Sequence, residues 1–246
     1  MHLTDTHIHL QDYPSSEAQK IYNCALKNNI YEFVIPSAHP SDWSKVIKTT
    51  RRFSGAIGAA GIHPWYIEDT TEKQLELLEE YLNKNSNLWV GECGIDRIKN
   101  PDTSKQIFFF TKQAELAVKY HRPLLVHCVK ADNEMEKLFP LLPKNTLFHS
   151  FNGSLEWGKK LQKHGFYLGL NLSFFKKENS AEILSELNLD KLLLETDAPY
   201  QQNNGYIKNS PENLPVLATA LSSAYGLSET EIIAILNRNF NEFKEK

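Results

Sequence analysis

The chain has 246 residues, of which 41% are hydrophobic and 23% are charged, with a formal net charge of −3 at neutral pH. This length suits one α/β barrel of roughly 250 residues, and the charge argues against a protein that coats nucleic acid through bulk positive charge. The three cysteines, Cys24, Cys93 and Cys128, form no CxxC pair, which argues against a disulfide framework and favours a reducing compartment.

Short apolar runs alternate with longer amphipathic stretches along the chain. Several runs are continuous rather than alternating, which is typical of strands buried on both faces. Eight strands are expected, over residues 3–8, 31–35, 56–62, 88–91, 124–126, 146–148, 166–170 and 191–194.

Helical patterns lie between these strands. Residues 71–74 form a capping-box pattern before an amphipathic run, and residues 228–231 form a second one before the last helix. Residues 103–120 and 155–161 carry apolar side chains at helical spacing, and Pro211 suits the first turn of a helix that runs to about Tyr225.

Eightfold strand–helix alternation predicts a parallel sheet, closed as a TIM-type (β/α)8 barrel that forms a single domain over residues 1–246. A doubly wound open sheet is the rival fold. It would place ligands at one switch point, whereas a barrel gathers side chains from most strand ends at its carboxyl face.

Polar side chains that bind divalent metals recur at the carboxyl ends of the predicted strands. His7 and His9 are two residues apart, so on an extended strand both imidazoles point to the same side. Glu92 directly follows an apolar run, where a carboxylate is costly to bury unless it is paired or metal-bound. The remaining members of the set are His127, His149 and Asp197.

This ligand set predicts two cations. One ion would be held by His7, His9 and Asp197, and the other by His127 and His149. Glu92 would bridge the two ions. Nitrogen and oxygen ligands without cysteine fit Mg, Mn or Zn, among other divalent metals.

Two ions about 3.5–4 Å apart would bind a phosphoryl group and activate water, with Asp197 as the base. His63 ends the third strand, where it suits a contact with a substrate phosphate better than a metal. Asp96 would orient a ligand or cap a turn. Neither a Walker loop nor a GxSxG motif is present, so cofactor-driven and serine-driven chemistries are not expected.

Six motifs together resemble the TatD family of metal-dependent hydrolases and DNases, within the wider group of amidohydrolase-like barrels. They are DTHIHL (5–10), GIHP (61–64), GECGID (91–96), LVH (125–127), HSFNG (149–153) and ETDAPY (195–200). The resemblance implies a TIM-type barrel with the same six metal ligands. It also implies a phosphoesterase, of the kind that includes magnesium- or manganese-dependent 3′–5′ exonucleases on DNA or RNA.

The substrate-contacting positions depart from the family pattern. Trp65 stands where a second histidine is common. Val129 occupies the position of an arginine, and the adjacent Lys130 would replace its charge without its bidentate fork. The family's Arg-Asn-Glu-Pro segment reads KNSP at 208–211, which keeps Asn209 as a substrate contact but changes its neighbours to Lys208 and Ser210.

Aromatic side chains near the predicted mouth are candidates for stacking on bases, which contributes about 1–3 kcal/mol for each base. The candidates are Trp65, Tyr66, Phe174, Phe175, Tyr200 and Tyr206.

The sequence therefore predicts a phosphodiester hydrolase, of the 3′–5′ deoxyribonuclease type, that acts on single-stranded DNA or another phosphodiester. An amidohydrolase or lactonase with the same metal site is the alternative, although no lysine ends a strand where carbamylation would make it the bridge. A third reading is a metal-holding binding module. Without a signal-peptide pattern or a membrane-spanning run, we expect a cytoplasmic protein with no obligate protein partner.

Overall fold

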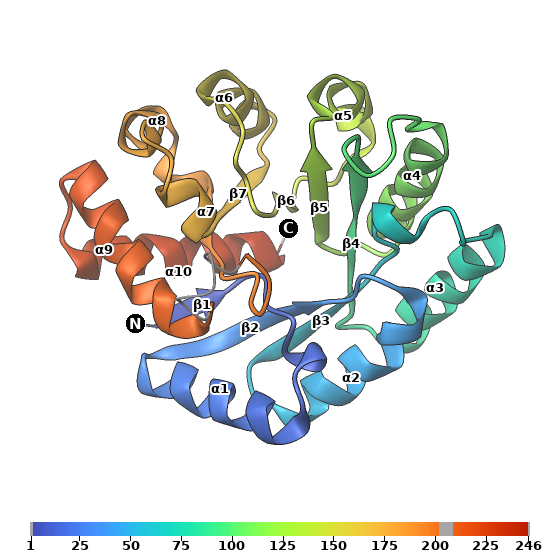
Figure 1. Cartoon of the computed structure of the whole chain (residues 1–246), viewed down its shortest axis with the longest axis horizontal. Coiled ribbons are helices and arrows are strands. Elements are labelled where there is room, and N and C mark those ends of the chain that lie inside the picture. The colour runs from blue at the N-terminus through green and yellow to red at the C-terminus, as the bar shows by residue number, and fades with distance from the viewer. Residues whose placement is uncertain (1, 202–208, 246) are drawn as a thin grey trace.

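Eight parallel strands form one sheet in the order β1 to β8, and each strand pairs with its neighbours in the sequence. The computed structural model describes residues 2–201 and 209–245. Figure 1 shows the labelled strands as an inner ring in chain order, with most of the helices outside it. The strands are β1 (Leu3–Asp5), β2 (Ile30–Pro36), β3 (Ala56–Ala60), β4 (Trp89–Asp96), β5 (Leu124–Val129), β6 (Thr146–Phe148), β7 (Tyr167–Leu170) and β8 (Leu192–Leu194). This sequential order confirms the TIM-type barrel, and the open doubly wound alternative is wrong.

The barrel is nearly closed through the segments that follow its first and last strands. The backbone N–H of Thr6 donates to the carbonyl of Leu194 over 3.1 Å, and that of Asp197 donates to the carbonyl of His7 over 2.8 Å. The segments after β1 and β8 therefore lie side by side, although they are almost two hundred residues apart in the sequence.

Two helices begin at the capping boxes that the sequence predicts. Thr71 and Gln74 form the predicted capping box before α3, and Ser228 exchanges hydrogen bonds with Glu231 at the start of α10. The helices are α1 (Ser15–Lys27), α2 (Trp43–Arg52), α3 (Glu72–Lys84), α4 (Ser104–Lys119), α5 (Asp132–Leu138), α6 (Leu155–Lys163), α7 (Leu172–Phe175), α8 (Ser180–Glu186), α9 (Leu214–Tyr225) and α10 (Glu229–Glu245). Within residues 2–201 and 209–245, no helix is long and apolar enough to cross a membrane.

The last helix fills one end of the barrel. Phe240 and Phe243 of α10 pack in one buried cluster with Trp89, Tyr167 and other strand residues that point into the barrel. Since Trp89 begins β4 and Tyr167 begins β7, α10 covers the amino-terminal end of the strands. The opposite, carboxyl end stays available for a site.

The ends of β1, β4 and β5 differ by three or more residues from those predicted, and β5, predicted to end at Val126, runs on to Val129 and contains His127. β1 ends at Asp5, so His7 and His9 lie in the segment after it rather than on the strand. β4 runs on to Asp96 and contains Glu92, where the pairing with β5 shifts register between Val90 and Cys93. Gly91 has a φ of +131°, which favours glycine, and this local kink gives β4 the irregularity that hydrophobic patterning does not reveal.

Candidate metal centre

Glu92 lies at the centre of a group of histidines at the carboxyl end of the barrel. One carboxylate oxygen, Oε1, faces three rings: Nε2 of His149 lies at 2.7 Å, Nδ1 of His127 at 2.9 Å and Nε2 of His63 at 3.2 Å. Nδ1 of His127 and Nε2 of His149 are themselves 3.2 Å apart. These groups come from within β4 and β5 and from the segments just after β3 and β6.

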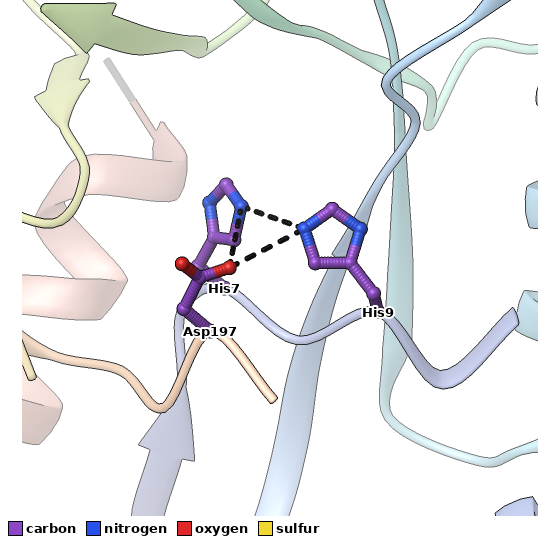
Figure 2. A group of neighbouring side chains, drawn as sticks. All are labelled: His7, His9 and Asp197. Atoms are coloured by element: carbon purple, nitrogen blue, oxygen red, sulfur yellow. Dashed lines mark hydrogen bonds and ion pairs between the residues drawn. The ribbon is translucent and has the colours of Figure 1, made fainter. Parts of the chain in front are cut away.

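The other oxygen of Glu92, Oε2, faces the segment after β1. It lies 3.2 Å from Nε2 of His7 and 4.0 Å from Nε2 of His9. Asp197 completes this side, with Oδ1 at 3.4 Å from Nε2 of His9 and 3.8 Å from Nε2 of His7. Figure 2 shows the two imidazoles and this carboxylate pointing toward one another. The hydrogen bonds that close the barrel bring Asp197 to this place.

The donor spacing fits two cations. Four ligands around one ion, with bonds of about 2.1 Å, lie roughly 3–4 Å apart, and the donors around each oxygen of Glu92 are separated by similar distances. The nitrogen and oxygen donors are also of the kind that divalent metals bind. All six predicted ligands are brought together, and Glu92 offers one oxygen to each group, as a bridging carboxylate would.

The carboxylates of this centre are buried and ionised. Burial opposes the charge of Glu92, but the imidazoles of His149, His63 and His7 hold the pKa of that carboxyl well below its usual range. Burial likewise opposes the charge of Asp197, whereas the hydrogen bond from His9 and the other imidazoles lower its pKa. Two anionic groups therefore face each other across a set of neutral or cationic rings.

His63 lies closer to this centre than the sequence suggests. Burial lowers its pKa to about 4 against the attraction of Glu92, so the ring is neutral near pH 7. Its Nδ1 accepts a hydrogen bond from the backbone N–H of Trp65 over 3.2 Å, which leaves the proton on Nε2, facing Glu92. The structure thus places His63 beside the proposed metal ligands, and its contact with substrate stays a prediction.

Asp96 connects His127 to Trp65. Its Oδ2 lies 3.3 Å from Nε2 of His127 and accepts the indole N–H of Trp65 over 2.7 Å, while its Oδ1 accepts the backbone N–H groups of Ile98 and Lys99. Burial opposes the charge of Asp96, but these hydrogen bonds lower its pKa overall. A carboxylate on the outer nitrogen of a metal-binding histidine fixes the orientation of the ring.

Glu195 occupies the corresponding place behind His149. Its Oε1 lies 3.6 Å from Nδ1 of His149 and accepts the backbone N–H of Ser150 over 2.6 Å. Gly169 makes room for it, because a Cβ at that position would lie 2.1 Å from Oε2 of Glu195. Glu195 is two residues from Asp197 in the sequence, whereas its contact with His149 spans 46 residues, so sequence patterning does not reveal this contact.

Asp5 ties the two ends of the chain beneath the centre. Its carboxylate accepts the hydroxyl of Thr196 over 2.6 Å and the backbone N–H groups of Thr196 and His7 over 3.0 and 3.3 Å. Burial raises the pKa of Asp5 to about 7. This group is not aimed at the proposed cations and instead holds the ligand-bearing segments together.

The predicted substrate contacts are less well placed. Lys130 is exposed and lines a neighbouring cavity of about 790 Å³ rather than the one that holds Glu92. Asn209 is buried, and its side-chain amide donates to the carbonyls of Thr196 and Tyr200 over 2.5 and 2.7 Å. In this structure Asn209 therefore binds the backbone at Thr196 and Tyr200, and its contact with a substrate stays a prediction. Lys208 and Tyr206 lie outside the described residues.

The cavity above Glu92 has a volume of about 260 Å³ and an aromatic rim. Trp65, Tyr66 and Tyr200 line it and remain exposed. Phe174, by contrast, is fully buried in the core and packs edge-on against the half-buried Phe175. The expectation that Phe174 stacks on a base is wrong, because α7 turns this residue inward.

Comparison with known proteins agrees with the fold and points to metal-dependent hydrolases. The family described as TatD related DNase matches residues 4–244. YjjV, an uncharacterized metal-dependent hydrolase of Escherichia coli K12, is 25% identical over 97% of this chain and 96% of its own length. A Cronobacter sakazakii protein described as a 3′-5′ ssDNA/RNA exonuclease is 30% identical over 63% of this chain and 62% of its own.

The crystal structure of E. coli YjjV superposes on this chain with a TM-score of 0.92 at 24% identity, covering 99% of this chain and 98% of the other. At that identity the agreement bears on the fold alone, and it supports the barrel derived above. The family match over almost the whole length of the chain shows more than the fold. The chain belongs to the family of TatD related DNases.

Proposed function

We propose that this chain hydrolyses phosphodiester bonds at the end of single-stranded nucleic acid, with two divalent cations held by the six convergent side chains. The arrangement of Glu92 carries the proposal, because its two oxygens face separate groups of donors at 2.7–3.2 Å and 3.2–4.0 Å. The Cronobacter relative described as a single-strand exonuclease supports the same substrate class.

His7, His9 and Asp197 would hold one cation, His127 and His149 the other, and Glu92 would lie between them. Bound divalent cations would polarise a phosphoryl oxygen and allow water to act as a nucleophile near neutral pH. Burial raises the pKa of Asp197, but the neighbouring imidazoles lower it by more. The carboxylate is therefore ionised and able to accept a proton.

Substitution of the bridging carboxylate tests the proposal. Glu92→Gln keeps the shape of the side chain but removes the charge shared by the two groups of donors. We expect kcat/KM on an end-labelled single-stranded oligonucleotide to fall by about 10³-fold or more, as when a group central to transition-state stabilisation is lost. Circular dichroism should show an unchanged fold.

The control is Glu80→Gln, which removes an exposed carboxylate paired with Lys84 on α3, far from the centre. Wild-type hydrolysis after exhaustive chelation would contradict the proposal, as would a Glu92→Gln enzyme of normal rate. Amide and lactone substrates assayed in parallel separate phosphodiester hydrolysis from amidohydrolase or lactonase chemistry. A cytoplasmic location stays a prediction, consistent with three free cysteines.

A further inference from the structure

We propose that the side chain of Trp65 is a fixed platform on which a nucleobase of the substrate stacks beside the bond to be cut. This inference rests on the proposed function and adds to it the way in which the strand end is recognised. It assigns the rim of the cavity to the base, whereas the metal centre below serves the phosphate.

Exposure distinguishes Trp65 from the other tryptophans. Trp65 is 52% exposed, whereas Trp43, Trp89 and Trp157 are at most 7% exposed. It lines the same cavity as Glu92 and His127. A large exposed aromatic surface beside polar functional groups is typical of a ligand site rather than of a solvated surface.

Two contacts hold the indole in place, while about half of the residue remains exposed. The indole N–H donates to Oδ2 of Asp96 over 2.7 Å, and the ring meets His63 edge-on, with centroids 5.3 Å apart at 88°. Asp96 is in turn held by two backbone N–H groups. A ring that is already ordered loses little conformational entropy when a ligand binds it.

The surroundings of the indole match the chemistry of a nucleotide. Tyr66 and Tyr200 line the same rim, 39% and 51% exposed. The ammonium group of Lys99 lies 5.6 Å from the centroid of the indole ring of Trp65. Aromatic faces next to a cation are the combination that binds single strands, because bases stack on the rings and phosphates pair with the charge.

Trp65 also reaches the metal centre through Asp96, so its two contacts must be tested separately. Trp65→Phe keeps an aromatic face but removes the N–H that binds Asp96. Trp65→Ala removes both. Loss of the face should raise KM for a strand, whereas loss of the N–H should weaken metal affinity through His127 and leave stacking largely in place.

An abasic substitution in the substrate isolates the stacking contact. Oligonucleotides that lack one base at each of the three terminal positions are compared with the intact strand at saturating Mn²⁺. For wild type we expect one position at which base removal lowers kcat/KM roughly tenfold, in keeping with the stacking of one base. In Trp65→Ala the intact and abasic strands should be cut equally well, and Trp65→Phe should retain most of the difference.

Fluorescence provides a second readout that does not need turnover. In the Glu92→Gln background, a single-stranded oligonucleotide should quench the tryptophan emission and protect it from quenching by acrylamide. The reason is that the indole of Trp65 is exposed to both the oligonucleotide and acrylamide. Both effects should vanish in Trp65→Phe. Phe108→Ala, which removes a 39% exposed aromatic of α4 outside the cavity, serves as the control.

The two proposals fail in different ways. If wild type cuts no oligonucleotide in Mn²⁺ or Mg²⁺, the proposed function and the stacking role are both overturned. If wild type cuts the intact strand but base removal costs wild type and Trp65→Ala equally at all three positions, stacking on Trp65 is overturned and the hydrolase stands.

Discussion

Glu92 shows how one buried charge organises a site. An ionised carboxylate in a dry environment is costly unless partners surround it, and here five imidazoles do so at 2.7–4.0 Å. The imidazole nitrogens behind this shell are held by Asp96 and Glu195. At the scale of single residues, Asp96 and Glu195 therefore tell as much about how the site is organised as the proposed ligands do.

Glu195→Gln is predicted to weaken metal binding without abolishing catalysis. The variant keeps the size of a side chain that fits against Gly169, but it removes the charge 3.6 Å from Nδ1 of His149. We expect a loss of about 10–100-fold in metal affinity, with kcat restored within a few-fold at saturating Mn²⁺. Calorimetric titration with Mn²⁺ and activity as a function of Mn²⁺ concentration check this.

An unchanged dissociation constant in Glu195→Gln would show that the carboxylate does not orient His149. A kcat that stays low at any Mn²⁺ concentration would instead make Glu195 a direct participant in the centre. The two results are separable because affinity and maximal rate are measured independently.

At the scale of elements, the sequence predicted which strands exist better than where they end. The continuous apolar runs correctly indicated all eight strands, and the residues after them correctly indicated a shared face. β4, however, continues five residues beyond the predicted end, through Glu92 to Asp96. Hydrophobic periodicity could not reveal this, because a register shift after Val90 and the mixture of Glu92, Gly94 and Asp96 with apolar residues break the apolar run.

The same limit applies to contacts between elements. The convergence of the six proposed ligands was predictable because each follows an apolar run, and strand ends of a barrel meet. The bond from Trp65 to Asp96 was not, since it joins the loop after β3 to the end of β4 and leaves no periodic signal. The inward turn of Phe174 depends in the same way on the packing of α7.

The link between β2 and α10 gives a pH-dependent prediction. Burial opposes the charge of Glu32, but hydrogen bonds from His2 over 2.9 Å and Lys244 over 2.6 Å lower its pKa. A carboxyl whose pKa is lower in the folded state stabilises the fold at pH values above its pKa in the unfolded chain, about 4.3. This stabilisation is lost as the pH falls through the pKa of the folded state.

Glu32→Gln should therefore lower the free energy of unfolding at pH 7 by about 1 kcal/mol, and the difference from wild type should shrink as the pH drops below about 4. Urea unfolding at several pH values measures it. Glu80→Gln, whose carboxylate is exposed, should show almost no difference at any pH. A constant gap between Glu32→Gln and wild type would refute the electrostatic explanation.

At the scale of the whole molecule, the proposed cations would join distant parts of the chain. The proposed ligands lie within or just after β1, β4, β5, β6 and β8, so metal binding would connect strands around the ring. Because a metal that binds only the native state stabilises it by about 2.7 kcal/mol at a hundredfold excess over its dissociation constant, the melting temperature should rise by roughly 5–10 °C.

Thermal melts of chelated protein, with and without added Mn²⁺, test this expectation. The shift should be much smaller in Asp197→Asn, which removes an anionic ligand at the point where β8 meets β1. An equal shift in wild type and Asp197→Asn would mean that Mn²⁺ stabilises the protein from another place.

The hydrogen bonds between the segments after β1 and β8 also restrict where new chain ends can be introduced by circular permutation. The bonds from Thr6 to Leu194 and from Asp197 to His7 belong to the segments that carry the ligands. A circular permutant opened between residues 194 and 198 would break the contacts that close the barrel and would also disrupt the proposed metal centre. New termini at exposed residues 86–87, at the far end of the strands, would spare both.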